Sequence, residues 1–272
     1  MKTMYKIDMR AETVEEVGEL PDEVLRYHPS QCATPSGALF VASGRTRNSL
    51  STSINDCVLF NLQTKQITHY PFPTLTRIGS GAAAIGSNIY LIGGTSNTKK
   101  MSRLDLNSKQ WNPCADLVCG VGYPIVCAVG KEIFVLTNTD VGNCSNYRRG
   151  DPIVLQCYDT DKNEWRVCAS LPPQVTDTEG SSAVAVWSGI YIVGGEGKLC
   201  LSYNVPENAW SVHEKPSMKH TNGSAVHLNG EIVLCGGSSS DEIEVFDIHR
   251  NEWRASSLKL PKRLDFLLCL NE

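Results

Sequence analysis

Short runs of apolar residues alternate with polar turns along the whole chain, and no stretch keeps the apolar spacing of a helix. In the segment 81–94, a run of small residues leads through a polar turn into a second apolar run that ends at Gly93-Gly94. The same pattern recurs at 182–195 and 223–237. Two short apolar runs joined by a tight polar turn predict an antiparallel hairpin. The sequence therefore predicts an all-β protein.

These hairpins belong to a longer repeat. In each unit an Asp or Asn follows an aromatic residue or Leu, and six positions later comes a Trp, or an Ile in one unit. The Asp and Asn positions are 61, 105, 159, 204 and 247, separated by 44, 54, 45 and 43 residues. A period of about 40 to 50 residues, with four strands in each unit, is typical of the blades of a β-propeller.

The two ends of the chain predict a sixth blade. Residues 5–21 carry a weak copy of the outer hairpin, and residues 264–270 supply one more apolar strand. We expect these segments to pair, because this would remove an exposed sheet edge. The prediction is a single six-bladed domain over residues 1–272. We expect the repeated Trp residues to pack between blades, and Trp187, outside that register, to lie in the core.

At these positions the chain resembles kelch repeats. The residues that carry the resemblance are the Gly pairs, an aromatic residue before two of them, and the repeated Trp. They are Gly93-Gly94, Gly194-Gly195, Gly236-Gly237, Tyr90, Tyr191, Trp111, Trp165, Trp210 and Trp253. Two units depart from the repeat, with Ser43-Gly44 in the first and Thr137-Asn138 in the third.

Composition narrows the class of protein. Apolar residues make up 41% of the chain and charged residues 20%, with a net charge of −4, so no overall positive field favours nucleic acid. No apolar run is long enough to span a membrane, and the charged N-terminus does not fit a secretory signal. We therefore expect a cytoplasmic protein. The eleven cysteines are odd in number and scattered without C-x-x-C spacing, which predicts buried free thiols rather than disulfides or zinc.

Catalytic patterns are absent from the sequence. The six histidines have no metal-ligand spacing, and there is no phosphate-binding loop and no G-x-S-x-G elbow. We therefore expect no cofactor and no enzymatic activity. An enzyme remains the weaker alternative, as a copper oxidase or a sugar-active enzyme, since some kelch-like propellers are enzymes.

Binding residues are predicted on the face where loops between second and third strands meet the linkers between blades. We expect one residue of each blade to lie at this face. Its position is found by counting 17 residues back from the last glycine of each double glycine, and from the inner strand in blades that lack a double glycine. These residues are Tyr27, Arg77, Val121, Thr178, His220 and Arg263. Lys219 adjoins them, and the variable loops add Arg45, Arg47, Tyr147, Arg148 and Arg149. A basic, partly aromatic surface fits an acidic peptide.

The resemblance to the BTB-kelch class implies the same kind of partner. In that class, arginines that begin the inner strands can line a pocket for acidic degron peptides, and Arg77 and Arg263 match this pattern. The resemblance thus implies a substrate-recognition module of a cullin-type ubiquitin ligase. The chain holds no BTB, BACK or F-box segment, so we expect it to bind a substrate without itself recruiting a ligase. A cytoskeletal role, as in actin-associated kelch proteins, stays open as the alternative.

Overall fold

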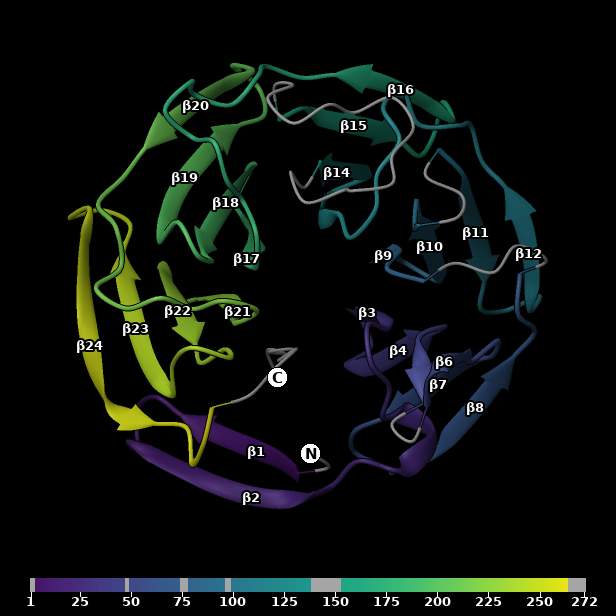
Figure 1. Ribbon diagram of the computed structural model, residues 1–272, viewed down its shortest axis with the longest axis horizontal. Coiled ribbons are helices and arrows are strands. Elements are labelled where there is room, and N and C mark those ends of the chain that lie inside the picture. The colour runs from purple at the N-terminus through teal and green to yellow at the C-terminus, as the bar shows by residue number, and fades with distance from the viewer. Residues whose placement is uncertain (1–2, 47–48, 74–77, 96–98, 138–152, 264–272) are drawn as a thin grey trace. The chain divides into compact units, whose positions relative to one another are not determined.

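The computed structural model describes residues 3–46, 49–73, 78–95, 99–137 and 153–263 of the 272-residue chain. In these residues the strands form five four-stranded antiparallel sheets, each a propeller blade with its strands in chain order (Figure 1). The blades are β3 (Ser30–Ala33), β4 (Ala38–Ala42), β7 (Cys57–Asn61) and β8 (Ile67–Tyr70); β9 (Gly81–Ile85), β10 (Asn88–Ile92), β11 (Met101–Asp105) and β12 (Gln110–Pro113); β13 (Ile125–Val129), β14 (Glu132–Leu136), β15 (Leu155–Asp159) and β16 (Glu164–Val167); β17 (Ser181–Val186), β18 (Gly189–Gly194), β19 (Leu199–Asn204) and β20 (Ala209–Val212); and β21 (Ser224–Leu228), β22 (Glu231–Cys235), β23 (Glu242–Asp247) and β24 (Glu252–Lys259). The predicted all-β propeller class is confirmed.

The second strand of each blade is the most deeply buried. In β10, Ile89, Leu91 and Ile92 are fully buried, and Tyr90 is 3% exposed. A strand that is covered on both faces needs apolar side chains at successive positions, which explains the continuous apolar runs before the double glycines. In the neighbouring strand β9, burial varies from residue to residue. Ala83 is buried in the core, while Ala82 and Ile85 are only half-buried.

The repeated Asp or Asn closes the hairpin between the third and fourth strands. The Asp159 carboxylate accepts hydrogen bonds from the backbone N–H groups of Asp161 and Lys162, and Asp247 does the same for His249 and Arg250. A short side chain that binds the backbone two and three residues ahead fixes the turn. The periodic Asp or Asn is therefore a turn-forming residue.

The sixth blade is not confirmed. Strands β1 (Thr3–Asp8) and β2 (Thr13–Glu19) pair only with each other, and residues 264–270 lie outside the described residues. The hairpin nevertheless covers the last blade, because Ile7, Met9 and Val14 pack against a cluster in β22–β24 that contains Val233 and Leu258. Figure 1 shows β1 and β2 beside β24.

The chain divides into two compact units. Unit 1 contains Met1–Leu25 and Asp177–Asn271, with the β1–β2 hairpin and the last two blades. Unit 2 contains Arg26–Thr176, with the first three blades. The single domain over residues 1–272 stays a prediction.

Three tryptophans of the fourth strands join neighbouring blades within the units. In unit 2, the indole N–H of Trp111 donates to Pro71 O (2.5 Å) and that of Trp165 to Ala115 O (3.0 Å); in unit 1, Trp253 donates to Glu214 O (2.7 Å). Each acceptor lies in the linker that leaves the preceding blade. These contacts confirm the predicted packing between blades.

Trp187 does not lie in the core, and that prediction is wrong. Its side chain is 64% exposed in the turn between β17 and β18, with a positive φ of 50°. The corresponding turns of two other blades have glycine with positive φ, at Gly86 and Gly130. The apolar run that suggested burial ends one residue earlier, at Val186, which is 2% exposed.

Candidate functional site

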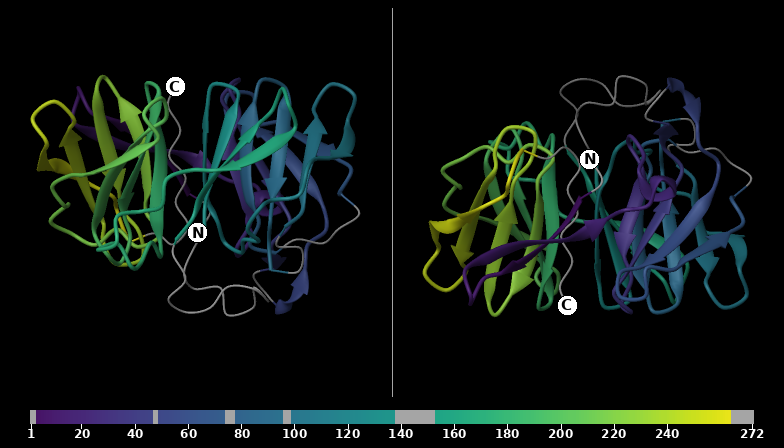
Figure 2. Two further views of the ribbon diagram at one scale, coloured as in Figure 1. Left: turned by 90° about the horizontal axis from the view of Figure 1, so that it is seen from above. Right: turned by 90° about the horizontal axis from the view of Figure 1, so that it is seen from below.

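Linkers and loops are hydrogen-bonded to one another on one face of unit 2. Tyr27 and Arg45 exchange two backbone hydrogen bonds of 3.0 and 2.9 Å. The Tyr123 N–H donates to Gly79 O at 2.7 Å. A small hairpin, β5 (Arg45–Thr46) with β6 (Ser49–Ser53), begins in the loop after β4 and extends beyond the end of that blade (Figure 2). The backbone thus joins two pairs of segments that are far apart in sequence, at residues 27 and 45 and at residues 79 and 123.

The side chains on this face form an aromatic and basic group, which we call the loop-face cluster: Tyr27, His28, Arg45 and Tyr123. Tyr27 is 39% and Tyr123 41% exposed. The His28 and Tyr123 rings meet edge to face, with centroids 5.4 Å apart. Burial, aided by the charge of Arg45, lowers the pKa of His28, so its imidazole is neutral at pH 7. The cation of the cluster is therefore Arg45.

Backbone strain is present at two of the three aromatic residues of this cluster. His28 and Tyr123 have positive φ values of 51° and 49°, a conformation that is costly for side chains with a Cβ. Gly79 makes room for the second ring, because a Cβ at Gly79 would lie 2.5 Å from Tyr123 Cε1. Strain of this kind persists only where the surrounding structure imposes it, and it is concentrated at functional sites.

The predicted site residues are only partly brought together. Tyr27 and Arg45 are neighbours, and Arg263 is exposed in unit 1. Val121 and Thr178 are fully buried. The remaining loop residues lie outside the described residues; they are Arg47, Arg77, Tyr147, Arg148 and Arg149. Sequence reasoning missed His28 and Tyr123, although an aromatic residue next to Tyr27 or in a linker was a usable signal.

Two predicted residues of unit 1 have different surroundings from those expected. Lys219 is exposed, but its Nζ forms an ion pair with Glu196 Oε2 at 2.9 Å. Glu196 also accepts a hydrogen bond from Thr221, and these two donors lower its pKa. His220 is 1% exposed, and both its ring nitrogens are hydrogen-bonded inside the blade. The prediction that His220 contacts a partner is therefore corrected, because its ring does not reach the surface.

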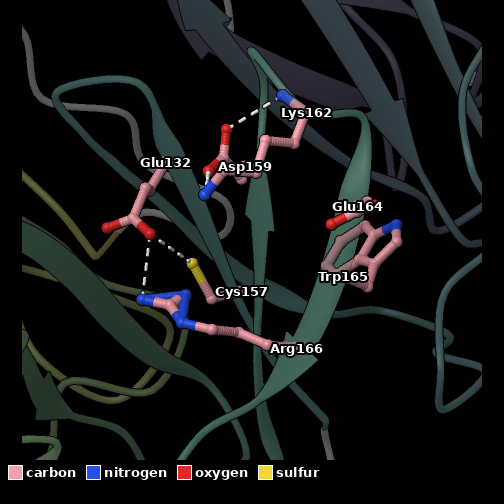
Figure 3. A pocket seen from close by; sticks show the side chains of 7 residues that line it. All are labelled: Glu132, Cys157, Asp159, Lys162, Glu164, Trp165 and Arg166. Atoms are coloured by element: carbon pink, nitrogen blue, oxygen red, sulfur yellow. Dashed lines mark hydrogen bonds and ion pairs between the residues drawn. The ribbon is translucent and has the colours of Figure 1, made fainter.

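A pocket of about 140 Å³ lies on the third blade, on strands β14 to β16 (Figure 3). Four of its five charged side chains form ion pairs, since Arg166 binds Glu132 (2.9 Å) and Lys162 binds Asp159 (2.9 Å). Cys157 points at Glu132, with Sγ 3.4 Å from Oε1. A hydrogen bond with Cys168, together with burial, raises the pKa of the Cys157 thiol, so it is not a nucleophilic thiolate. The pocket supports no catalytic role for these residues.

The described ranges contain neither a metal-ligand cluster nor a membrane-spanning helix. There, no group of three or more His, Cys, Asp or Glu side chains is placed to hold a metal ion. No described helix is long and apolar enough to cross a membrane.

Comparison with known proteins identifies a kelch motif in one of the repeats. Residues 76–118, which span the second blade, match the family model described as "Kelch motif". The chain is a β-propeller with a kelch motif. It is 24% identical to Kelch-like protein 23 of Homo sapiens over 246 residues, and 21% identical to Kelch-like protein 25 of Xenopus tropicalis over 273 residues. These alignments cover 86% and 93% of this chain, but 42% and 44% of the relatives.

The resemblance to BTB-kelch proteins is supported by a further relative. The chain is 25% identical over 150 residues to "Kelch repeat and BTB domain-containing protein 2" of Homo sapiens, covering 49% of this chain and 22% of that protein. The chain spans less than half the length of each of these relatives. The similarity therefore concerns the propeller, and the kelch motif lies within unit 2, the unit that carries the loop-face cluster.

Proposed function

We propose that this propeller is a non-catalytic module that binds a protein partner through the loop-face cluster, and that the partner supplies an acidic segment. The observation that carries the proposal is that exposed Tyr27 is paired with Arg45, while exposed Tyr123, with a strained backbone, packs on His28 beside Tyr27. Tyrosine and arginine are the residues that most often dominate binding energy at interfaces. The resemblance to kelch-like proteins supports a protein partner in general.

An acidic partner follows from the charge and donors of the cluster. Arg45 offers a planar set of N–H donors, and the Tyr27 and Tyr123 hydroxyls can donate as well. His28 is neutral and packs on Tyr123, so it contributes ring surface rather than charge. From the sequence alone we also propose further partner-binding residues: Arg47, Arg77, Tyr147, Arg148 and Arg149, and separately Lys219 and Arg263 of unit 1.

We further propose that the partner is a substrate of a cullin-type ubiquitin ligase and that binding takes place in the cytoplasm. The support for the ligase role is the resemblance to BTB-kelch proteins. The support for the compartment is that Cys32, Cys57, Cys127, Cys157 and Cys200 are free thiols, as expected in a reducing environment. An actin-associated role is the second candidate function, because the kelch resemblance includes cytoskeletal proteins.

Binding can be measured with a fluorescent polyglutamate peptide, with polyglutamine and polylysine peptides as probes of charge. We expect the acidic peptide alone to bind, with an affinity that falls as salt rises. Arg45→Ala should raise Kd by roughly 30-fold, the cost of a partly buried charge-assisted contact. Lys131→Ala is the matched control, because Lys131 is an exposed cation of the same unit in the turn between β13 and β14.

Circular dichroism of each variant must show a folded protein. Equal binding by Arg45→Ala and wild type would contradict the proposed site. Capture of partners from cell extract by the wild type and by Arg45→Ala, followed by mass spectrometry, then separates the two functions. Cullin subunits or ubiquitinated substrates lost with the variant support the ligase role, and actin lost with it supports the cytoskeletal role.

A further inference from the structure

A histidine and a glutamate form a buried pair in unit 1. His220 lies in the linker between β20 and β21, and Glu244 lies on β23. Their side chains are 0% and 1% exposed, and His220 Nε2 is 2.9 Å from Glu244 Oε2. Buried ionisable groups are costly unless they are paired and hydrogen-bonded, so the protonation of this pair is determined by its surroundings.

The atoms around the ring define its protonation. His220 Nδ1 is 2.7 Å from Gly236 O, and a backbone carbonyl oxygen can only accept a hydrogen bond. Nδ1 must therefore carry a proton. Nε2 faces a carboxylate oxygen, which also acts only as an acceptor when ionised. With two acceptors on opposite sides, the ring satisfies both only when each nitrogen carries a proton.

The glutamate is ionised, because it accepts several hydrogen bonds. Its Oε1 accepts from the N–H and the hydroxyl of Ser217 (2.9 and 2.7 Å), and its Oε2 accepts from the Met218 N–H (3.0 Å). Burial by itself would raise the pKa of Glu244, but the donors of His220, Ser217 and Met218 hold it at about 2. A neutral carboxylic acid would turn one of its oxygens into a donor and lose part of this arrangement.

We propose that His220 is held as an imidazolium, and that its proton fixes the linker 217–221 against the last blade, so that order in this linker depends on pH. When the proton leaves, the Nε2 lone pair faces the Glu244 carboxylate and the hydrogen bond is lost. The linker carries Lys219, so the arrangement of the loops around Lys219 would change. This last consequence rests on the proposed function, because Lys219 is one of the residues assigned to the partner surface.

The other charges around the ring do not replace this proton. Lys219, on the same linker, is paired with Glu196 of the β18–β19 turn. Lys198, from that turn, donates to Ser217 O at 3.0 Å. Glu242, on β23, is paired with the exposed Lys259. The end of β18 and the β22–β23 turn contact His220 through glycine, since Gly195 N–H donates to its backbone oxygen and Gly236 O accepts from its ring. Glu244 is thus the carboxylate that balances His220.

Long-range ¹H–¹⁵N correlation spectra of histidine rings test the protonation directly. At about pH 7.5, where an ordinary histidine is mostly neutral, we expect both ring nitrogens of His220 to give protonated shifts. The signals of the exposed His249 ring serve as an internal comparison. In Glu244→Gln the side-chain amide can donate to Nε2, so we expect a neutral ring with its proton on Nδ1. Glu242→Gln, the matched control on the same strand, should leave the His220 shifts unchanged.

Hydrogen exchange tests the consequence for the linker. The protection factors of the Ser217 and Met218 amides should fall by roughly 10- to 100-fold from about pH 6 to about pH 10 in the wild type and in Glu242→Gln, the effect of losing a charge-assisted hydrogen bond. In Glu244→Gln they should be lower and independent of pH. An unprotonated His220 nitrogen in the wild type at about pH 7.5, or protection that does not change with pH, would overturn the proposal. Neither the nitrogen shifts nor the hydrogen exchange requires a binding partner. A negative result would therefore contradict the His220 proposal without contradicting the proposed binding function.

Discussion

Trp165 should contribute strongly to stability, although it is not fully buried. Its indole N–H donates to Ala115 O at 3.0 Å, and its ring lies 5.2 Å from that of Tyr158. It packs on a core cluster of the second and third blades that includes Tyr90 and Leu117. Replacement by alanine would remove all three interactions at once and weaken the junction between two blades.

The size of the effect can be worked out from these contacts. Half of a tryptophan side chain is about 100 Å² of buried area, which corresponds to about 2.5 kcal/mol at 25 cal/mol per Å². The hydrogen bond and the aromatic pair add about 1 kcal/mol each, with partial overlap. We expect Trp165→Ala to lower the free energy of unfolding by about 3 to 4 kcal/mol. Trp165→Phe keeps the aromatic packing and loses the hydrogen bond, so it should cost about 1 kcal/mol.

The assay is urea unfolding followed by far-ultraviolet circular dichroism, because removing a tryptophan changes the fluorescence signal itself. Trp187→Ala is the matched control, since the same chemical change is made at a side chain that is 64% exposed. It should change the free energy of unfolding by less than about 0.5 kcal/mol. Equal unfolding midpoints for Trp165→Ala and Trp187→Ala, with unchanged m-values, would refute the assignment of the repeated tryptophans to packing between blades.

Three further changes test other parts of the fold. Trp187→Gly should stabilise the protein by up to about 1 kcal/mol in the same urea assay, because glycine accepts the positive φ without strain. Deletion of residues 1–21 should lower the melting temperature and promote association, since Ile7, Met9 and Val14 would no longer cover the last blade; an unchanged melting temperature would contradict this. Glu244 has a pKa lowered from 4.5 to about 2, so it contributes about 3 kcal/mol above pH 4.5. This contribution should be lost as the pH falls from 4.5 to 2, and Glu244→Gln should flatten that part of the curve of stability against pH.

The parts of the fold that were predictable from sequence are those that each blade builds locally. The Asp or Asn at 105, 159 and 247 accepts hydrogen bonds from residues two and three positions ahead, so its role is contained in a few consecutive residues. The repeated Trp contacts a linker some 40 or 50 residues away, but it does so in each repeat through the same kind of acceptor, a backbone oxygen. The sequence repeat was therefore enough to predict both the turn-forming Asp or Asn and the repeated Trp.

The candidate site was harder to predict, because it depends on linkers that do not repeat. Counting a constant 17 positions selected Tyr27, which is exposed, but it also selected Val121, which is fully buried. Tyr123 reaches the surface two residues later by adopting a positive φ and resting on Gly79. That conformation depends on a glycine of another linker, and a count along one repeat contains no information about it.

The partner of His220, Glu244, occupies a position of the repeat at which another blade has a different residue, and the hydrogen-bond partners of each residue explain the difference. Three residues before the periodic Asp stand Gln156 on β15 and Glu244 on β23, which are 0% and 1% exposed. Gln156 faces a linker through one N–H and one carbonyl, both of Cys119, and a neutral amide satisfies both. Glu244 faces donors alone, from Ser217, Met218 and the His220 ring, and only a carboxylate can accept them all. A buried carboxylate requires a balancing charge, and the linker supplies it in His220, the residue that the position count had assigned to the surface.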